Sequence, residues 1–167
     1  NCCLDFEGEN TEVSAVFHLL KVITKVLKER LEEMAKFIWF FFDCLFKWMA
    51  CVLGRTQMLR DESQRSERFP QQFYVAFGEL VYLLNQCFRS LCESDVGLAR
   101  DFNRSVALFL HDCLSLMDRG ILMEFIAVYI SSLASKGLRY DFQTNCKFDA
   151  LDIICNHEQF VSINLPS

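Results

Sequence analysis

Proline and glycine are scarce in this chain, which has two prolines and six glycines among its 167 residues. Because these residue types interrupt regular structure, their scarcity predicts long unbroken segments, which favour helices over a sheet with many turns. The chain also lacks a block of basic residues, and its net charge is −5. A protein that follows the phosphates of a nucleic acid needs such a block, so we expect no nucleic-acid partner.

Motifs that hold metals, nucleotides or cofactors are missing too. The chain has no G-x-G-x-x-G stretch, no phosphate-binding loop and no C-x-x-C pair to complete a zinc site. His18 belongs to a polar helix face. His157 and Glu158 begin a near match to the zinc-protease motif H-E-x-x-H, but Val161 occupies the position of its second histidine. Cys155 would diverge from His157 on a helix, so we predict no metal-binding and no cofactor-binding residue.

Groups that could act in catalysis are equally isolated. His111 and Asp112 would lie on the outer side of their helix. Cys113 would face a different side from His111, with nothing to orient it as a nucleophile. Ser105 and Ser115 are interpreted as ordinary helix-surface residues. We therefore predict no catalytic residue and no enzymatic activity in this chain.

Apolar and aromatic residues, by contrast, are abundant. They make up 52% and 14% of the chain, with 17 phenylalanines, and the chain is long enough to bury a substantial core. The richest stretch runs from Phe37 to Leu53, where fifteen of seventeen residues are apolar. Its two charged residues, Asp43 and Lys47, form a single line along a helix with the neighbouring Lys36.

A membrane span is the first alternative for this stretch. A span needs about 20 apolar residues. The run is shorter, and Asp43 and Lys47 would lie near the middle of the bilayer at a high energetic cost. No second span, signal peptide or lipidation motif is recognisable. We therefore interpret Phe37–Leu53 as the most buried core helix, on which the other helices pack.

The nine cysteines do not predict a disulfide framework. Their number is odd, the chain is not short, and no secretory segment is recognisable. Five of them fall at core positions of the expected helices, where Cys behaves as a small apolar residue: Cys44, Cys51, Cys87, Cys113 and Cys155. We expect free thiols and a reducing, cytosolic environment.

Apolar residues recur with the helical period along most of the chain. The expected helices run from Thr11 to a turn at Lys28–Glu33, over Phe37–Leu53, from Pro70 to Cys92, over Leu98–Met117, from Ile121 to Leu133, over Phe142–Cys155 and, briefly, from Asn156. Asp118 is expected to cap the fifth helix. In the sixth, the residues expected to be buried are Phe148, Leu151, Ile154 and Cys155.

A polar, highly charged segment from Gly54 to Arg68 separates the second expected helix from the third. We predict that this segment is a disordered internal loop within a single helical-repeat domain that covers residues 1–167. The chain begins with Asn and ends in Asn164–Ser167, which looks like a cut, so we expect a fragment of a larger protein.

About six to seven helices joined by short turns predict antiparallel helical hairpins that stack on one another. A closed bundle and an α-solenoid both fit this pattern. No repeat of 34 or 33 residues is detectable, which argues against tetratricopeptide and ankyrin arrays, whereas degenerate armadillo or HEAT-like repeats of about 40–47 residues fit the spacing. The predicted fold class is all-α, an armadillo/HEAT-like α-solenoid fragment.

Four segments, taken in order, resemble one family. They are Trp39-Phe40-Phe41-Phe42-Asp43, Arg65-Ser66-Glu67-Arg68-Phe69-Pro70, Leu114-Ser115-Leu116-Met117-Asp118-Arg119-Gly120, and Cys155-Asn156-His157-Glu158-Gln159-Phe160 through Asn164-Leu165-Pro166. In order and rough spacing they resemble the DOCK (dedicator of cytokinesis) guanine-nucleotide exchange factors, most closely the zizimin and zizimin-related branches. The matching region of these proteins is the helical-repeat segment between the lipid-binding C2-like domain and the catalytic exchange domain.

The resemblance implies a cytosolic multidomain activator of the Rho-family GTPases Cdc42 or Rac. A separate C-terminal domain carries out exchange in that family, so the resemblance assigns no catalytic residue to this chain. The segment would be a non-catalytic scaffold that links the lipid-binding and exchange domains and docks protein partners. It would be cytoplasmic, recruited to membranes through other domains and not inserted in them.

Two other classes of function stay open on the residues alone. An unrelated helical bundle that acts as an enzyme or binds a ligand would need a pocket with converging titratable groups. A self-associating module is the other alternative, because a solenoid separated from its neighbours exposes apolar end faces. Light scattering across a concentration series would separate such a module from a monomeric scaffold.

Overall fold

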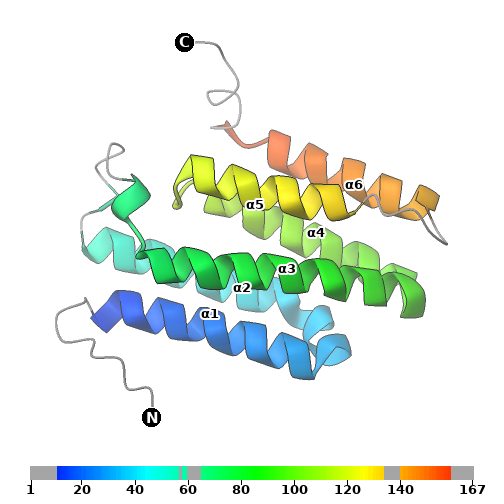
Figure 1. Cartoon of the computed structure of the whole chain (residues 1–167), viewed down its shortest axis with the longest axis horizontal. Helices are drawn as coiled ribbons and strands as arrows, with labels where there is room; N and C mark the ends of the chain where they lie inside the picture. The colour runs from blue at the N-terminus through cyan, green and yellow to red at the C-terminus, as the bar shows by residue number, and fades with distance from the viewer. Residues whose placement is uncertain (1–10, 57, 60–64, 134–139, 159–167) are drawn as a thin grey trace.

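The computed structural model describes residues 11–56, 58–59, 65–133 and 140–158 (Figure 1). For residues 11 and 12 it describes the backbone but not the side chains. This part of the chain is all-helical and contains no strand. Its elements are α1 (Thr11–Glu29), α2 (Leu31–Arg55), the short 3-10 helix η1 (Arg65–Glu67), α3 (Gln71–Ser94), α4 (Val96–Cys113), α5 (Arg119–Ser132) and α6 (Tyr140–Cys155). The all-α prediction is confirmed, and the short helix expected from Asn156 lies largely outside the described residues.

Local sequence signals explain where the helices begin. Asp118 caps α5 as expected, because its Oδ1 accepts a hydrogen bond from the backbone N–H of Ile121 at 3.0 Å. Asp95 caps α4 in the same way, accepting from the backbone N–H of Leu98, so α4 begins earlier than its apolar pattern indicated. Arg30 interrupts the helical backbone between α1 and α2, within the turn that the charge-rich segment predicted.

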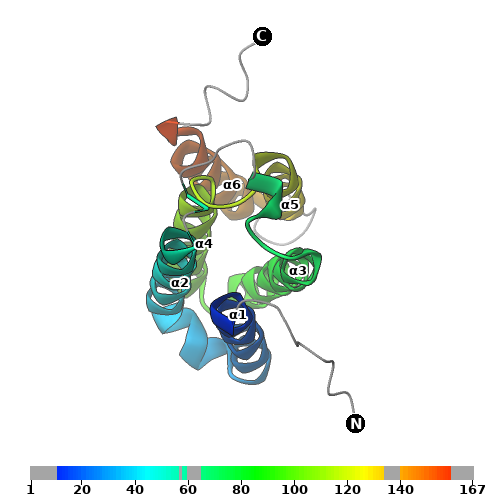
Figure 2. The same ribbon diagram turned by 90° about the vertical axis from the view of Figure 1, so that its left-hand side faces the viewer.

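The helices form two layers. Figures 1 and 2 show α1, α3 and α5 side by side in one layer, and α2, α4 and α6 in the other. The three helices of each layer run in the same direction, opposite to those of the facing layer (Figure 1). Each odd-numbered helix therefore pairs with the next helix as a hairpin, and three such hairpins stack in chain order, as in an α-solenoid.

Aromatic rings fill the space between the layers. Phe42 of α2 stacks on Phe109 of α4, with ring centroids 4.3 Å apart. Phe77 of α3 contacts Phe109 at 5.7 Å and Phe125 of α5 at 5.4 Å. These contacts join four helices from three hairpins, so the core is continuous across the stack.

A buried polar chain fastens the last hairpin to the middle one. The Tyr129 hydroxyl of α5 donates to Asn103 Oδ1 of α4 at 2.9 Å, and Asn103 Nδ2 donates to the backbone carbonyl of Cys146 in α6 at 2.9 Å. Both side chains are buried. Because each buried group has a partner, removal of any one of them would leave another unsatisfied.

The prediction that Phe37–Leu53 is the most buried helix was wrong. Its inner face is fully buried, including Ile38, Phe42 and Leu45. However, Trp39 is 58% exposed and Trp48 is 50% exposed. Trp39 lines a pocket with Ser105 and Leu108 on the α4 side of the helix. For Trp48 the reason is the position of α2 at the end of its layer. Only α4 lies beside it there, so one flank of α2 is not covered by any helix in the described part of the chain.

The residues expected to be buried in the sixth helix are corrected for the same reason. Ile154 is buried, but Phe148 is 64% exposed, Cys155 is exposed and Leu151 is half-buried. The α6 helix is the last of its layer, so its flank away from α4 also lacks a neighbour among the described helices. Cys51 of α2, another expected core thiol, is likewise exposed.

The segment expected as a loop, Gly54–Arg68, contains ordered ends. Gly54 still belongs to α2, and residues 57 and 60–64 lie outside the described part of the chain. At its other end, Arg65 Nη1 donates to the backbone carbonyl of Leu114 at 2.9 Å, and Arg68 Nη1 donates to that of Leu116 at 3.1 Å. Both arginines are buried. This end of the segment is therefore fastened to the connection between α4 and α5.

Candidate functional site

The most prominent surface feature is an apolar line on the uncovered flank of α2. It consists of Phe37, Phe41, Cys44, Trp48 and Cys51, which we call the α2 stripe. The spacing of four, three, four and three residues places all five on one side of a helix. Phe41 and Cys44 are half-buried, whereas the other three are exposed. The opposite flank of α2 is the one that packs on α4.

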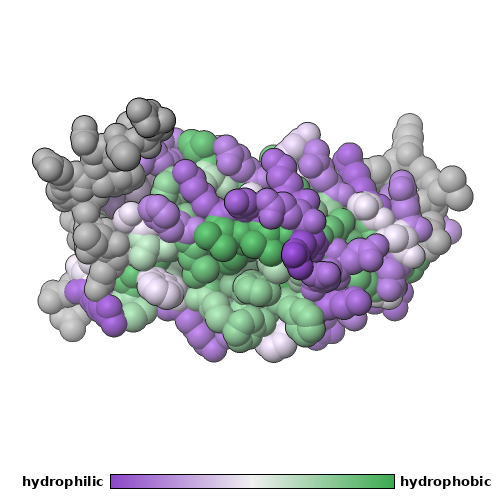
Figure 3. All heavy atoms as spheres, turned by 90° about the horizontal axis from the view of Figure 1, so that it is seen from below, coloured by the Kyte–Doolittle hydropathy of each residue, from purple (hydrophilic) through white to green (hydrophobic). Residues whose placement is uncertain are grey.

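The neighbouring helix of the hairpin extends this apolar surface. Ala15, Leu19, Val22 and Val26 follow one another along one flank of α1 with spacings of four, three and four residues. Val22 is exposed and the other three are half-buried. Together with the α2 stripe they form what we call the end face of the stack. Figure 3, which views the molecule from the α1 side, shows hydrophobic surface gathered in the middle and hydrophilic residues around it.

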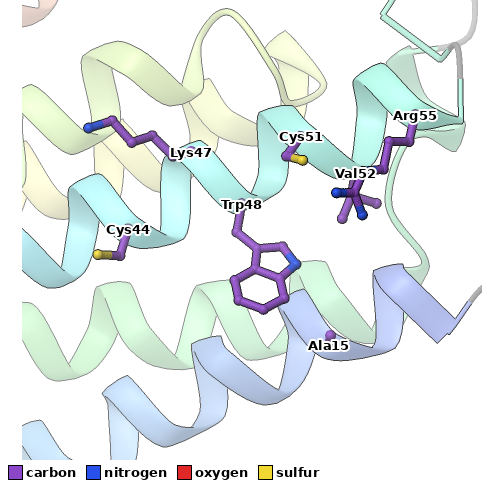
Figure 4. Close-up of a pocket in the computed structure, with 7 residues that line it drawn as sticks. All are labelled: Ala15, Cys44, Lys47, Trp48, Cys51, Val52 and Arg55. Carbon is purple, nitrogen blue, oxygen red and sulfur yellow. The ribbon is translucent and has the colours of Figure 1, made fainter.

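A groove of about 560 Å³ runs between α1 and α2 on this side. Its lining residues, labelled in Figure 4, are Ala15, Cys44, Lys47, Trp48, Cys51, Val52 and Arg55. Figure 4 shows the Trp48 indole reaching from α2 toward α1, close to Ala15. A groove with an aromatic anchor and few polar atoms suits an apolar side chain or helix of a partner protein.

Charged residues surround the apolar part of the end face. Lys47 Nζ and Asp43 Oδ2 form an exposed ion pair at 2.7 Å, and the hydrogen bond and charge of Asp43 raise the pKa of Lys47. Residues 11–55 contain seven Lys or Arg against five Asp or Glu, so this hairpin is net basic in a chain of net charge −5. An apolar centre within a charged rim is the usual anatomy of a protein–protein interface.

The α2 helix also passes a length and composition test for a membrane span. It is the one helix of the described chain that does so, and 33% of its most apolar window is buried. Core helices of water-soluble proteins pass the same test. The line of Lys36, Asp43 and Lys47 along α2 would have to enter the bilayer, at a cost of about 2.5–3.5 kcal/mol for each charge at its centre. We therefore treat the stripe as a surface for protein contact.

One polar cluster was missed by the sequence analysis. Ser115 Oγ lies 3.0 Å from Nε2 of His157, although Ser115 had been interpreted as an ordinary surface residue. The His157 ring also packs against that of His111 at 4.6 Å between centroids, and Asp112 Oδ1 lies 2.9 Å from His111 Nδ1. No spacing rule could find the contacts of His157, because they join the end of α4 and the turn after it to the residues after α6.

This cluster holds the residues after α6 against the turn after α4. His157 is buried, and its pKa is lowered first by burial and then by the nearby His111. The backbone carbonyl of Ser115 accepts a hydrogen bond from Arg68, which fixes the turn on its other side. Within the described residues, no group of three or more His, Cys, Asp and Glu side chains is placed to hold a metal ion.

The remaining thiol candidate is inert. Cys113 is fully buried, and burial raises its pKa well above the ordinary value, so it does not supply a thiolate. Burial likewise raises the pKa of Cys87 and Cys146 to about 11. Cys44, Cys51, Cys87, Cys113, Cys146 and Cys155 are free thiols. His18 is exposed on α1, as expected for its polar face.

Comparison with known proteins identifies the family. A family profile described as "DOCK6-11, TPR domain" matches residues 8–155. The description uses the tetratricopeptide name, which the absence of a 34-residue period had argued against. In the structure the hairpins begin at Thr11, Gln71 and Arg119, farther apart than the repeats of a tetratricopeptide array. No solved structure matches the chain significantly.

Several curated proteins are similar over most of the chain. Human dedicator of cytokinesis protein 9 is 32% identical over 153 residues, which cover 89% of this chain and 7% of the relative. Human dedicator of cytokinesis protein 7 is 34% identical over 131 residues, covering 77% of this chain and 6% of the relative. Human dedicator of cytokinesis protein 8 is 32% identical over 137 residues, which cover 80% of this chain and 6% of the relative. The chain therefore spans less than a tenth of these relatives, and it belongs to the dedicator of cytokinesis family as a helical domain.

Proposed function

We propose that this chain is a non-catalytic scaffold and docking segment of a DOCK-type guanine-nucleotide exchange factor that acts on Rho-family GTPases such as Cdc42 or Rac. Residues 1–167 would form one helical-repeat domain with an internal loop between α2 and η1. It would link the lipid-binding and exchange domains, as the resemblance to the zizimin and zizimin-related branches suggests. The observation that carries the proposal is the end face of α1 and α2.

The composition of the end face supports docking of proteins. Aromatic residues, Trp and Phe among them, are enriched at protein–protein interfaces, and the end face presents Phe37, Phe41 and Trp48 in half-buried or exposed positions. Exposed apolar surface of this kind marks an interaction site in a water-soluble protein. The partners would be other domains of the parent protein and separate proteins, with the GTPase engaged by the exchange domain.

The alternative of a helical enzyme lacks a comparable observation. The groove between α1 and α2 is mainly apolar, and the groove beside Glu29, Arg30 and Glu32 is lined by exposed charges. The part-buried Ser115–His157 contact holds the end of the fold in place. No cofactor is part of the proposal, nor is nucleic acid. The parent protein would be cytoplasmic and would reach membranes through its other domains.

The proposal is tested in the parent protein with substitutions in the end face. Trp48→Ser combined with Phe37→Ser should impair recruitment of the parent to membranes in cells, or its assembly with partners. The activity of the isolated exchange domain should not change, because that domain lacks this segment. Tyr82→Ser is the matched control, since Tyr82 is an exposed aromatic residue on α3, outside the end face.

The contradicting result is equally concrete. If the double substitution leaves recruitment and assembly of the parent at the level of the Tyr82→Ser control, the end face does not dock a functional partner. Thermal melting of the variant domain must be checked beside it. The substituted side chains are largely exposed, so a small change in melting temperature is expected.

A further inference from the structure

The far end of the stack carries a second apolar line. Tyr140, Thr144, Phe148, Leu151 and Cys155 follow one another along one side of α6, with spacings of four, four, three and four residues, and we call this line the α6 stripe. Tyr140 and Phe148 are among the most exposed aromatic residues of the described chain, and Cys155 is exposed as well. The α6 stripe thus resembles the α2 stripe in length, character and exposure.

The α6 stripe points out of the stack. The other side of α6 faces α4, where Arg100 lies over the Phe142 ring at 5.6 Å and Asn103 donates to the Cys146 carbonyl. Tyr140 and Leu151 lie on the side turned away from Phe142. The two stripes therefore mark opposite ends of one layer, α2 at its beginning and α6 at its end (Figure 2).

We propose that these two ends bind each other between copies, so that the α6 end of one copy stacks head-to-tail on the end face of the next. This inference rests on the proposed function, because it names a second copy of the chain as a partner of the end face. A second copy placed in this way would continue both layers. The α6 helix of the second copy would lie beside α2 of the first copy, on the flank opposite to the one that packs on α4.

The geometry of the two stripes suits this arrangement. The α2 and α6 helices run in the same direction within their layer (Figure 1), so a stacked copy presents its stripe parallel to the α2 stripe. At 1.5 Å per residue both stripes are about 21–23 Å long. When the stripes are aligned from their first residues, Tyr140 lies opposite Phe37 and Cys155 lies opposite Cys51.

Charge favours a head-to-tail contact over a symmetric one. The α6 helix carries Asp141, Asp149 and Asp152 against a single lysine and is net acidic, whereas the hairpin of the end face, residues 11–55, carries seven Lys or Arg against five Asp or Glu and is net basic. A symmetric contact between two end faces would bring together two hairpins of the same net charge. A head-to-tail contact places the acidic helix of one copy against the basic hairpin of another.

A flat membrane surface fits the end face less well than a helix does. The polar line of α2, with Lys36, Asp43 and Lys47, faces outward, whereas the α2 stripe lies on the uncovered flank, next to the groove between α2 and α1. The apolar surface is hollowed into a groove of about 560 Å³ between the two helices. A helix of a second copy can enter this space, but a bilayer would meet the charged line first.

The contact predicts a distinctive pattern of assembly. A head-to-tail contact does not close on itself, so the average mass of the intact chain should rise continuously with concentration. Sedimentation velocity from about 1 to 100 µM, the range of moderate affinities, measures this rise. Trp48→Ser removes one end and Phe148→Ser removes the other, so each variant alone should remain monomeric. Tyr82→Ser should assemble like the wild type.

Mixing the two variants distinguishes a head-to-tail contact from a symmetric one. Each variant keeps one intact end, so an equimolar mixture should form a one-to-one complex and nothing larger. A symmetric contact between end faces predicts the opposite, since Phe148→Ser would then dimerise by itself. If Trp48→Ser fails to fold by circular dichroism, Phe37→Ser replaces it, because Phe37 is exposed on the same stripe.

Cross-linking tests the alignment independently. Cys51 and Cys155 are free and exposed, so a short bis-maleimide should join Cys51 of one copy to Cys155 of another. Peptide mapping of the cross-linked dimer should identify this pair, and Phe148→Ser, which blocks assembly, should abolish it. Absence of the pair from a cross-linked assembly would overturn the proposed alignment.

The inference fails if the intact chain stays monomeric up to about 100 µM, or if Phe148→Ser assembles like the wild type. It also fails if the end face binds anionic phospholipid vesicles while the chain remains monomeric, which would assign the face to a membrane. These failures differ from failure of the proposed function. A monomeric chain whose end-face variants still disrupt the parent protein would refute self-stacking and retain the docking role.

Discussion

Phe42 of α2 and Phe109 of α4 stack with their ring planes 11° apart and their centroids 4.3 Å apart. Both side chains are buried. The pair lies where the first hairpin meets the second, and Phe109 also contacts Phe77 of α3. The end face is therefore held in place by the same aromatic core that joins the hairpins, and weakening that core would loosen the surface proposed to bind partners.

Substitution of this core ring should be costly, whereas substitution of its exposed neighbour should not. Phe42→Ala is expected to lower the free energy of unfolding by about 3–5 kcal/mol, because it leaves a cavity among packed rings. Trp39→Ala, on the same helix but 58% exposed, should cost less than about 1 kcal/mol. Urea melts of the two variants measure the difference. Equal losses would mean that Trp39 is packed in the core after all.

The contrast between these two residues shows what the helical period can and cannot predict. The period correctly placed Phe42 inward and the line of Lys36, Asp43 and Lys47 outward. It could not decide between the flanks of α2, because whether a flank is covered depends on which helices lie beside it in the stack. The prediction of a fully buried helix required every apolar side of α2 to be covered, and the exposure of Trp39 and Trp48 contradicts it.

The hydrogen bonds of Arg68, which hold the segment after α2 in place, should contribute measurably to the free energy of unfolding. Arg68→Ala removes donors from the backbone carbonyls of Leu116 and Met58. Hydrogen bonds from charged groups contribute about 1.5–3 kcal/mol, so a loss of that order is expected in the free energy of unfolding. Glu67→Gln is the control, because Glu67 is exposed beside it. A loss no larger than that of the control would show that the arginine contacts do not stabilise the fold.

Replacement of residues 60–64 by Gly and Ser should by contrast leave the melting temperature nearly unchanged. The free-energy cost of closing a loop changes little with its composition when its length is kept. Hydrogen exchange gives an independent reading of the same segment. Strong amide protection across residues 56–64 would contradict the prediction of a disordered internal loop.

The stability of the fold should depend on the protonation of His157. Its pKa is lowered in the folded state by burial and by His111, so the folded state disfavours the charged ring. Above the ordinary histidine pKa of about 6.5 neither state binds the proton. As the pH falls below that value, the unfolded chain takes up a proton that the folded chain resists, and the free energy of unfolding decreases.

Chemical denaturation of wild type and His157→Gln between about pH 7.5 and 5.5 tests this dependence. The stability advantage of the wild type should shrink as the pH falls. His18→Gln is the matched control, because His18 is exposed, and it should keep the wild-type pH profile. Parallel profiles for wild type and His157→Gln would show that burial of this histidine does not couple folding to pH.

The thiols should separate into two classes on alkylation. Without reductant, the unfolded chain should show nine modifiable cysteines, since no disulfide is expected. In the folded chain Cys51 should react first, because it is exposed, whereas Cys87 and Cys113 should be protected by burial and by their raised pKa values. Mass spectrometry over time resolves the order. Rapid labelling of Cys113 in the folded chain would contradict its burial.

The candidate site was predictable only in part. Every residue of the α2 stripe was visible in the sequence, but as core and not as surface. The contact between Ser115 and His157 was not predictable, because the two residues are 42 positions apart and belong to different segments of the fold. The family resemblance supplied what the residues alone could not, since neither apolar periodicity nor spacing distinguishes a docking surface from a core.

The central claim is that this chain is a scaffold and does not itself catalyse nucleotide exchange. The most direct measurement is release of fluorescent GDP from Cdc42 and from Rac, with the chain present at tens of micromolar and with removal of magnesium by a chelator as the positive control. The release rate should equal that of the GTPase alone, because the chain offers no group that disturbs the nucleotide site. A clear acceleration by the wild-type chain, abolished by Trp48→Ser, would contradict it and make the end face part of an active exchange module.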